Sequence, residues 1–250
     1  MKLGVLIKRD LNFEADLNFE AQTYWNRDDE WTKKVSHFLG SGKFTKKRWR
    51  KIGEGNWKRF IAIVKALNLD LSAFSVACEW GSGGGSNVVK LSDHFLMIYG
   101  VDISKQSLQE TSRRLQEIRR EHVFRPVHIE CGDPESCVDR MSNRSADLFL
   151  STACFQHFSS CDYADRVLQI AVRILREGGL AIIQFRLNDG GRFYRPKSID
   201  YCGGKRRNAI RFTSHTISEF YDMATRAGFA DTGYIEFTPA NCVYAYLVKP

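Results

Sequence analysis

The stretch Val76–Gly85, VACEWGSGGG, decides the fold, because a short apolar run ends in an acid and passes at once into glycines. The apolar run predicts a buried strand. Gly81, Gly83 and Gly85 predict a loop in which the main chain turns with positive φ and lies open to a ligand. A helix is expected over residues 87–92, with its free N–H groups facing the same ligand. The stretch therefore predicts a strand, a nucleotide-binding loop and a helix.

Two nucleotide-binding patterns compete for this loop. A dinucleotide fingerprint needs a small glycine at its third position, and Ser86 stands there instead. The pattern E-x-G-x-G-x-G is filled completely by Glu79–Gly85. A second apolar run, Phe95–Asp102, ends in a carboxylate 23 residues after Glu79. That is close to the spacing of about 20 at which an acid on the second strand binds ribose hydroxyls. The alternatives are a plain flexible turn for the glycines and helix N-capping for Asp102.

Helix and strand patterns alternate along the rest of the chain, which is typical of a doubly wound parallel sheet. Further strands are expected at 126–130, 146–151, 180–185, 232–237 and 243–248, the last two as an antiparallel hairpin. Helices are expected at 104–121, 163–175 and 213–228, with a helix-ending turn at 176–179. Thr213 or Ser214 is expected to cap the last helix.

The first part of the chain differs in composition, and we expect a helical, aromatic arm and lid over 1–55 on a domain over 56–250. The segment LNFEA occurs twice within the first 22 residues, which indicates a local duplication in an amphipathic or loosely ordered arm. Residues 43–51 hold six basic residues in nine, as either a solvated surface or part of an arm that closes the pocket. Helices are expected around this segment, at 29–39 and 54–67.

Composition indicates one globular domain with an appendage. The 250 residues are 43% hydrophobic and 26% charged, and no apolar run reaches the roughly 18 residues of a membrane helix. The start is too short for a signal peptide, and the seven scattered cysteines form no C-x-x-C, so we expect reduced thiols in a cytoplasmic protein. The net charge of +8 indicates an anionic substrate or a nucleic acid.

From about residue 56 to 250 the chain resembles the class I S-adenosylmethionine (SAM)-dependent methyltransferases. The stretches CEWGSGGGSN, YGVDIS, FQHF and LREGGLAIIQF look like a bacterial branch of O-methyltransferases that act on polysaccharides and natural products. The resemblance implies a Rossmann-like, mostly parallel α/β sheet of seven strands in the order 3-2-1-4-5-7-6. It also implies SAM as the cofactor. The residues it assigns to cofactor binding are Glu79, Gly81, Gly83 and Gly85 around the methionine part, Asp102 at the ribose, Ile103 and Asp133 at the adenine, and Ser151 and Thr152 in the floor.

One departure from related families limits the chemistry. Residues 151–154 read Ser-Thr-Ala-Cys, where methyltransferases acting on adenine or amide nitrogen have N/D-P-P-Y/F. The Pro-Cys pair of the C5-cytosine enzymes is also missing, and no metal-binding set is visible. These departures argue against methylation of adenine or amide nitrogen, and the resemblance to the bacterial O-methyltransferase branch implies a hydroxyl as the acceptor.

A hydroxyl is a poor nucleophile at neutral pH, so a general base is expected, and histidine suits that task. His157 follows the fourth strand and is the first candidate, with packing beside the cofactor as the alternative. His215 is the second candidate. A basic insertion loop at 188–211 is expected to act as a lid or binding loop. The expected substrate-binding residues are Arg186, Asn188, Arg192, Tyr194 and Arg195.

The sequence thus favours a SAM-dependent O-methyltransferase acting on an anionic small molecule or a phosphorylated saccharide. Methylation of RNA is the alternative enzyme activity, suggested by the positive charge. A SAM-fold binding protein without catalysis is the third. An NAD oxidoreductase is disfavoured by Ser86. The aromatic arm could also pack across a homodimer.

Overall fold

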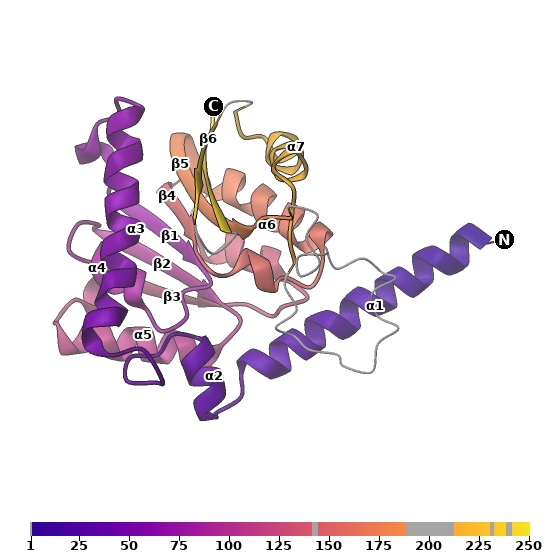
Figure 1. Cartoon of the computed structure of the whole chain (residues 1–250), viewed down its shortest axis with the longest axis horizontal. Coiled ribbons are helices and arrows are strands. Elements are labelled where there is room, and N and C mark those ends of the chain that lie inside the picture. Colours follow the sequence, from indigo (N-terminus) through magenta and orange to yellow (C-terminus); the bar gives the residue numbers. More distant parts are fainter. Residues whose placement is uncertain (1, 142–144, 189–212, 231–232, 239–241) are drawn as a thin grey trace.

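The computed structural model describes residues 2–141, 145–188, 213–230, 233–238 and 242–250, with residues 2–13 described by their backbone alone. At the centre of this part of the chain is a seven-stranded sheet with the order β3-β2-β1-β4-β5-β7-β6 (Figure 1). The strands are β1 (Val76–Trp80), β2 (Met97–Asp102), β3 (Phe124–His128), β4 (Ala146–Ser151), β5 (Leu175–Arg186), β6 (Gly233–Phe237) and β7 (Cys242–Val248). The first five pair in parallel, and β7 runs antiparallel to both β5 and β6. The expected Rossmann-like sheet is confirmed.

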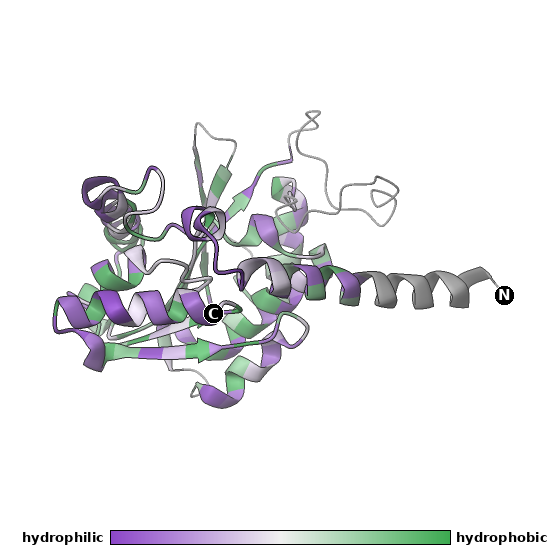
Figure 2. Ribbon diagram, turned by 90° about the horizontal axis from the view of Figure 1, so that it is seen from below, coloured by the Kyte–Doolittle hydropathy of each residue, from purple (hydrophilic) through white to green (hydrophobic). Residues whose placement is uncertain are grey.

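Helices cover both faces of the sheet (Figure 1). They are α1 (Lys2–Trp25), α2 (Glu30–Val35), α3 (Lys46–Ala66), α4 (Ser86–Leu91), α5 (Lys105–Glu117), α6 (Cys161–Ile174) and α7 (Ile217–Ala227). One face packs against α3, α4 and α5, and the other against α6 and α7. Figure 2 shows apolar residues gathered on the strands and on the inner sides of these helices.

Successive side chains along each strand point to opposite faces of the sheet and so contribute alternately to two apolar clusters. On β4, Leu148 and Leu150 belong to the cluster under α3, α4 and α5, whereas Phe149 belongs to the cluster under α6 and α7. All three side chains are buried. Strand order reverses between β1 and β4, and ligands of open α/β sheets bind at such a point, outside the carboxyl ends of the strands. The glycine loop follows β1 at this point.

The helix α3 begins earlier than expected and passes straight through Gly53 and Gly55. Gly53 lies where α3 crosses α4, and a Cβ there would stand 2.4 Å from the carbonyl oxygen of Ser86. The Ser86 hydroxyl accepts from Gly53 N–H at 3.0 Å and donates to the Trp49 carbonyl at 2.6 Å. Ser86 therefore joins two turns of α3 to the start of α4, which explains a serine where a dinucleotide fold carries glycine.

The expected cap of the last helix is wrong. Thr216, with Glu219 three residues later, forms a capping box, and α7 begins at Ile217. Thr213 and Ser214 lie in an extended segment, because the Thr213 N–H donates to the Gln156 carbonyl at 2.7 Å. This bond ties the segment to the loop after β4.

The structure differs from other sequence-based expectations in detail. β3 runs over 124–128 rather than 126–130. The turn expected at 176–179 lies inside β5, where Gly178 supplies a φ of 72°. Residues 2–22, which include the duplicated segment, belong to the continuous helix α1. The domain boundary expected at residue 55 falls within α3. Among the described residues no helix has the length and apolarity to cross a membrane.

Candidate cofactor and acceptor site

A cavity opens at the carboxyl ends of β1, β2 and β4. Its wall includes Glu79, the loop residues 81–87, Asp102, Ile103, Thr152 and His157. The three alternating glycines have φ values of 76°, 50° and 80°, all in the left-handed region that the sequence predicted for them. The structure therefore brings together most of the residues expected to bind the cofactor.

Glu79 ends β1 inside this cavity with 1% of its surface exposed. Its Oε1 accepts from Asn87 Nδ2 at 2.6 Å, while Oε2 has no partner among the described residues. Burial raises the pKa of Glu79 to about 8, and the charge of Asp102 adds to the rise, although the hydrogen bond from Asn87 opposes it. The carboxyl group therefore carries a proton at neutral pH until a cationic group binds beside it.

Asp102 is held by two main-chain donors. Its Oδ2 accepts from Gly83 N–H at 2.9 Å and its Oδ1 from Ser104 N–H at 2.8 Å. Burial raises its pKa to about 6, against the lowering effect of these N–H groups. Each carboxylate oxygen keeps a second lone pair, so the group can also accept from a diol.

The floor of the cavity is a strained loop after β4. Thr152 accepts from Asn87 Nδ2 at 3.0 Å. Ala153 has a φ of 54°, uncommon for a residue with a side chain, and its N–H donates to Gln184 Oε1 at 2.8 Å. Cys154 then brings its sulfur to within 2.4 Å of where a Cβ of Gly81 would stand, so Gly81 cannot be replaced without moving the floor.

The N-terminal helices form the outer wall. Ala21 and Trp25 of α1 line the cavity. Gln22 donates to the Ile103 carbonyl at 2.9 Å and accepts from Cys131 N–H at 2.6 Å. Asn26 donates to the same Ile103 carbonyl at 2.9 Å. These bonds fasten α1 across the ends of β2 and β3.

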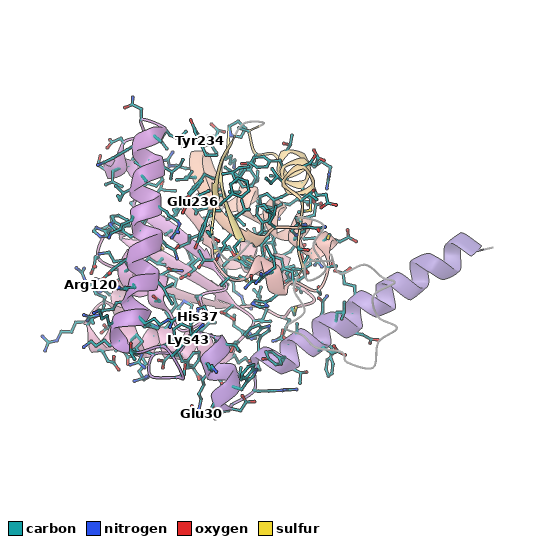
Figure 3. The ribbon with its side chains drawn as sticks, viewed as in Figure 1. Glu30, His37, Lys43, Arg120, Tyr234 and Glu236 are labelled. Carbon is teal, nitrogen blue, oxygen red and sulfur yellow. The ribbon has the colours of Figure 1, made fainter. Side chains whose placement is uncertain are left out.

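The segment between α2 and α3 closes the glycine loop. Its Ser36 carbonyl accepts from Gly84 N–H at 2.7 Å, and His37 lines the cavity. Burial lowers the pKa of His37 to about 4, and the positive charge of Lys43 lowers it further (Figure 3). His37 is therefore neutral at physiological pH. The segment between α2 and α3 therefore contacts the glycine loop through the Ser36 backbone carbonyl and the neutral His37 side chain.

His157 lies at the cavity edge on a short 3₁₀ turn, Phe155–His157. Its ring meets Trp25 edge-to-face, with centroids 5.2 Å apart. Gln156 Nε2 donates to His157 Nε2 at 3.2 Å. This bond occupies the Nε2 lone pair, so Nε2 can take a proton from a hydroxyl only when the acceptor displaces the Gln156 amide.

Other residues expected in the site lie elsewhere. His215 is 2% exposed, packs against Phe185 and Phe220, and has a pKa lowered to about 4 by burial, so it has no access to the cavity. Ser151 is fully buried and donates to the Trp80 carbonyl at 3.0 Å.

Asp133 is exposed on the turn after β3 and does not line the cavity. Arg186 ends β5 and Asn188 follows two residues later; both are half-buried, and neither lines the cavity. Arg192, Tyr194 and Arg195 lie outside the described residues. In the part of the chain that is described, no cluster of His, Cys, Asp or Glu could hold a metal ion.

Sequence reasoning did not assign roles to Asn87, Gln22 and Trp25. Asn87 had a signal, since it follows the glycine loop in the first turn of α4. Gln22 and Trp25 act over more than 80 positions of sequence, and no local pattern announces such contacts.

Residues 78–183, from β1 to β5, match the family described as a methyltransferase domain. Magnesium protoporphyrin IX methyltransferase from Synechocystis PCC 6803, solved with bound S-adenosylhomocysteine (SAH), is 17% identical with a TM-score of 0.60 over 92% of this chain and 98% of that one. The 1,6-didemethyltoxoflavin-N1-methyltransferase from Burkholderia thailandensis is 20% identical, with a TM-score of 0.54 over 75% of each chain. The [4+2]-cyclase SpnF is 13% identical, with a TM-score of 0.52 over 71% of this chain and 75% of that one. No curated protein matches significantly.

At these identities the solved structures show the fold, which is that of the class I methyltransferases. Residues 78–183 are thus similar to a family of methyltransferase domains that depend on SAM.

Proposed function

We propose that this protein is a SAM-dependent methyltransferase that methylates a hydroxyl of an anionic or phosphorylated saccharide or a related small molecule. One observation carries the proposal. A single cavity joins Glu79, the glycine loop and Asp102 at one end to His157 and Trp25 at its edge. The first set suits a nucleoside with a cationic amino-acid tail, and the second suits an acceptor.

The residues present fit SAM. The buried Glu79 Oε2 without a partner can receive an ammonium group, and Asp102 can accept from ribose hydroxyls. Ser82 Oγ is also buried without a partner among the described residues and lines the same wall. When bound, SAM supplies an activated methyl group, so the protein mainly has to position the acceptor.

His157 is the proposed general base, and Gln156 and Trp25 fix its ring. Removal of the hydroxyl proton at that ring accounts for about 10²–10⁴-fold in rate. Arg186 and Asn188 are proposed to contact the anionic part of the acceptor from the end of β5. Two structural neighbours are named as methyltransferases of magnesium protoporphyrin IX and of 1,6-didemethyltoxoflavin, which supports a small-molecule acceptor.

Isothermal titration with SAH, beside NAD⁺, tests the cofactor assignment. We expect saturable SAH binding and no NAD⁺ binding; the reverse would overturn the proposal. Transfer of labelled methyl groups from SAM to a panel of phosphorylated sugars and other anionic hydroxyl compounds then tests the reaction. The His157→Gln variant should keep its SAH affinity and lose turnover. Unchanged turnover in that variant would remove His157 from the mechanism.

A second candidate function is methylation of RNA, because a basic surface adjoins the cavity. Lys46, Lys47, Arg50 and Lys51 are exposed at the start of α3, and Ile52 on the same helix lines the cavity. RNA binding that weakens steeply with salt, together with methyl transfer to RNA, would favour this candidate. The [4+2]-cyclase SpnF shares the fold, so a chain that binds SAH but transfers no methyl group would indicate a third activity.

A further inference from the structure

A continuous chain of buried hydrogen bonds runs from Glu79 at the cavity, past the middle of α3, to Tyr244 on β7. Asn87 Nδ2 donates to Glu79 Oε1 at 2.6 Å. Asn56 Nδ2 on α3 donates to Asn87 Oδ1 at 2.9 Å, and the Tyr244 hydroxyl on β7 donates to Asn56 Oδ1 at 3.2 Å. All four side chains are buried, between 1% and 6% exposed. Four polar groups thus lie in line inside an apolar core.

The hydrogen bonds in this buried network all run in the same direction, from Tyr244 towards Glu79. The Tyr244 hydroxyl donates to Asn56 Oδ1. Because that oxygen is the acceptor for Tyr244, the Asn56 side-chain nitrogen must point to Asn87. The Asn87 oxygen is then used in turn, so its nitrogen must point to Glu79 and Thr152. Bonds aligned head to tail polarise one another in a medium of low dielectric constant. The arrangement delivers a fixed N–H donor to Oε1 of Glu79, a residue of the cavity wall, and leaves Oε2 without a hydrogen-bond partner among the described residues.

The outer end of the chain is anchored as well. The Arg59 guanidinium lies over the Tyr244 ring, 4.2 Å from its centroid, and forms hydrogen bonds of 3.0–3.1 Å with Glu236 on β6 (Figure 3). Glu236 also accepts from the Tyr246 hydroxyl. Asn56 and Arg59 are one turn apart on α3, so this helix is held at both positions. The packing of α3 therefore fixes where Asn87 and Glu79 stand.

We propose that Asn56 and Tyr244, which do not line the cavity, are positioning residues that act through Asn87 to hold Glu79 for the amino-acid part of the cofactor. This inference rests on the proposed function, since the ammonium group belongs to SAM and SAH. It assigns α3 a specific role: the helix sets affinity for the amino-acid end of the ligand, while Asp102 sets affinity for its nucleoside end. Disturbing the chain should therefore affect only ligands that carry the amino acid.

Two ligands distinguish binding of the amino-acid part from binding of the nucleoside part. SAH carries the amino-acid part, and 5′-methylthioadenosine lacks it. In Asn56→Asp the side chain keeps its shape but loses the donor to Asn87, and in Tyr244→Phe only the hydroxyl is lost. We expect Asn56→Asp to weaken SAH by about tenfold or more and Tyr244→Phe to weaken it several-fold, as measured by isothermal titration, with 5′-methylthioadenosine changed by less than about twofold. Tyr221→Phe is the matched control, because its hydroxyl donates to the Tyr234 carbonyl and touches no member of this hydrogen-bond chain, and both ligands should bind it as they bind the wild type.

Equal weakening of the two ligands would show a merely structural role for Asn56 and Tyr244, and unchanged SAH affinity would show no role; either result overturns the inference. Thermal melting identifies variants that do not fold, and Tyr244→Phe remains decisive if Asn56→Asp is among them. If wild type binds neither ligand, the proposed cofactor itself is wrong. If wild type binds both and the variants show no split, the proposed function stands and the inference falls.

Discussion

The main-chain N–H of Gly83 donates to the carboxylate of Asp102 at 2.9 Å. This bond joins the glycine loop after β1 to the end of β2 without any ligand. A second bond of the same kind, from Gly81 N–H to the Val101 carbonyl at 2.8 Å, lies beside it. The loop is therefore already shaped when the cofactor arrives, so little ordering remains to oppose binding.

Replacement of Asp102 should accordingly affect both stability and binding. Asp102→Ala leaves the N–H groups of Gly83 and Ser104 without their acceptor, and we expect the free energy of unfolding to fall by about 1–3 kcal/mol. SAH should bind at least about tenfold more weakly, because the ribose loses its acceptor. Urea denaturation and calorimetric titration measure the two effects. Asp93→Ala is the control, since Asp93 is exposed and forms an ion pair with Lys90. Full SAH affinity in Asp102→Ala would contradict the ribose assignment.

Gly84 is required for a different reason, namely contact with the N-terminal arm. A Cβ at Gly84 would stand 2.4 Å from the His37 carbonyl oxygen and 2.9 Å from the Phe38 Cα. We expect Gly84→Ala to lower the free energy of unfolding by about 1–3 kcal/mol and to speed proteolysis within residues 36–45, because the arm must move away. Gly132→Ala is the control, since a Cβ there meets nothing within 4 Å. Equal protease resistance in the two variants would show that the arm does not depend on this contact.

The sequence predicted the sheet and the core of the site because those features are local. Each strand is a short apolar run, and the carboxylates Glu79 and Asp102 directly end two of them. The three glycines have the left-handed φ that their spacing indicated. A strand end and the loop after it are fixed by adjacent residues, so sequence patterns suffice there.

The sequence could not show the contacts that close the site. Gln22 meets Ile103 across 81 positions and Asn56 meets Asn87 across 31, and such pairs follow from packing alone. From the sequence, His215 was a candidate general base like His157. In the structure it forms a β-bridge with Leu187 and is buried beside α7. Burial of a histidine depends on the elements that cover it, and these become known only when the sheet is assembled.

Removal of the Gln22 side chain should loosen α1. Gln22→Ala loses the bonds to the Ile103 carbonyl and the Cys131 N–H, and we expect hydrogen exchange at Cys131 to speed up and SAH to dissociate faster by several-fold. Hydrogen exchange by mass spectrometry and stopped-flow displacement measure these effects. Phe19→Ala is the control on the same helix, because the Phe19 side chain is 73% exposed. An unchanged dissociation rate in Gln22→Ala would show that α1 does not cover the bound ligand.

Binding of SAH should release a proton at neutral pH. Burial raises the pKa of Glu79 from its ordinary value of 4.5 to about 8, so the ligand-free protein carries a proton there at pH 7. The ammonium group of SAH favours the ionised carboxylate, and the proton then leaves. Titrations at pH 7 in phosphate and in Tris, which differ in ionisation enthalpy, should indicate release of close to one proton. Glu79→Gln should abolish most of this release, leaving the smaller contribution of Asp102, whose pKa is raised to about 6.

The same shift makes the stability of the ligand-free protein depend on pH. Because the folded protein holds the Glu79 proton more tightly than the unfolded chain does, the contribution of this group is complete below pH 4.5 and is lost as the pH rises through about 8. The free energy of unfolding should therefore decline between about pH 5 and pH 8 in wild type and decline less in Glu79→Gln. Saturating SAH should flatten the wild-type curve, since the bound ammonium group stabilises the ionised form. Identical pH profiles for wild type and Glu79→Gln would mean that Glu79 is already ionised in the folded protein and meets the cofactor as a preformed anion.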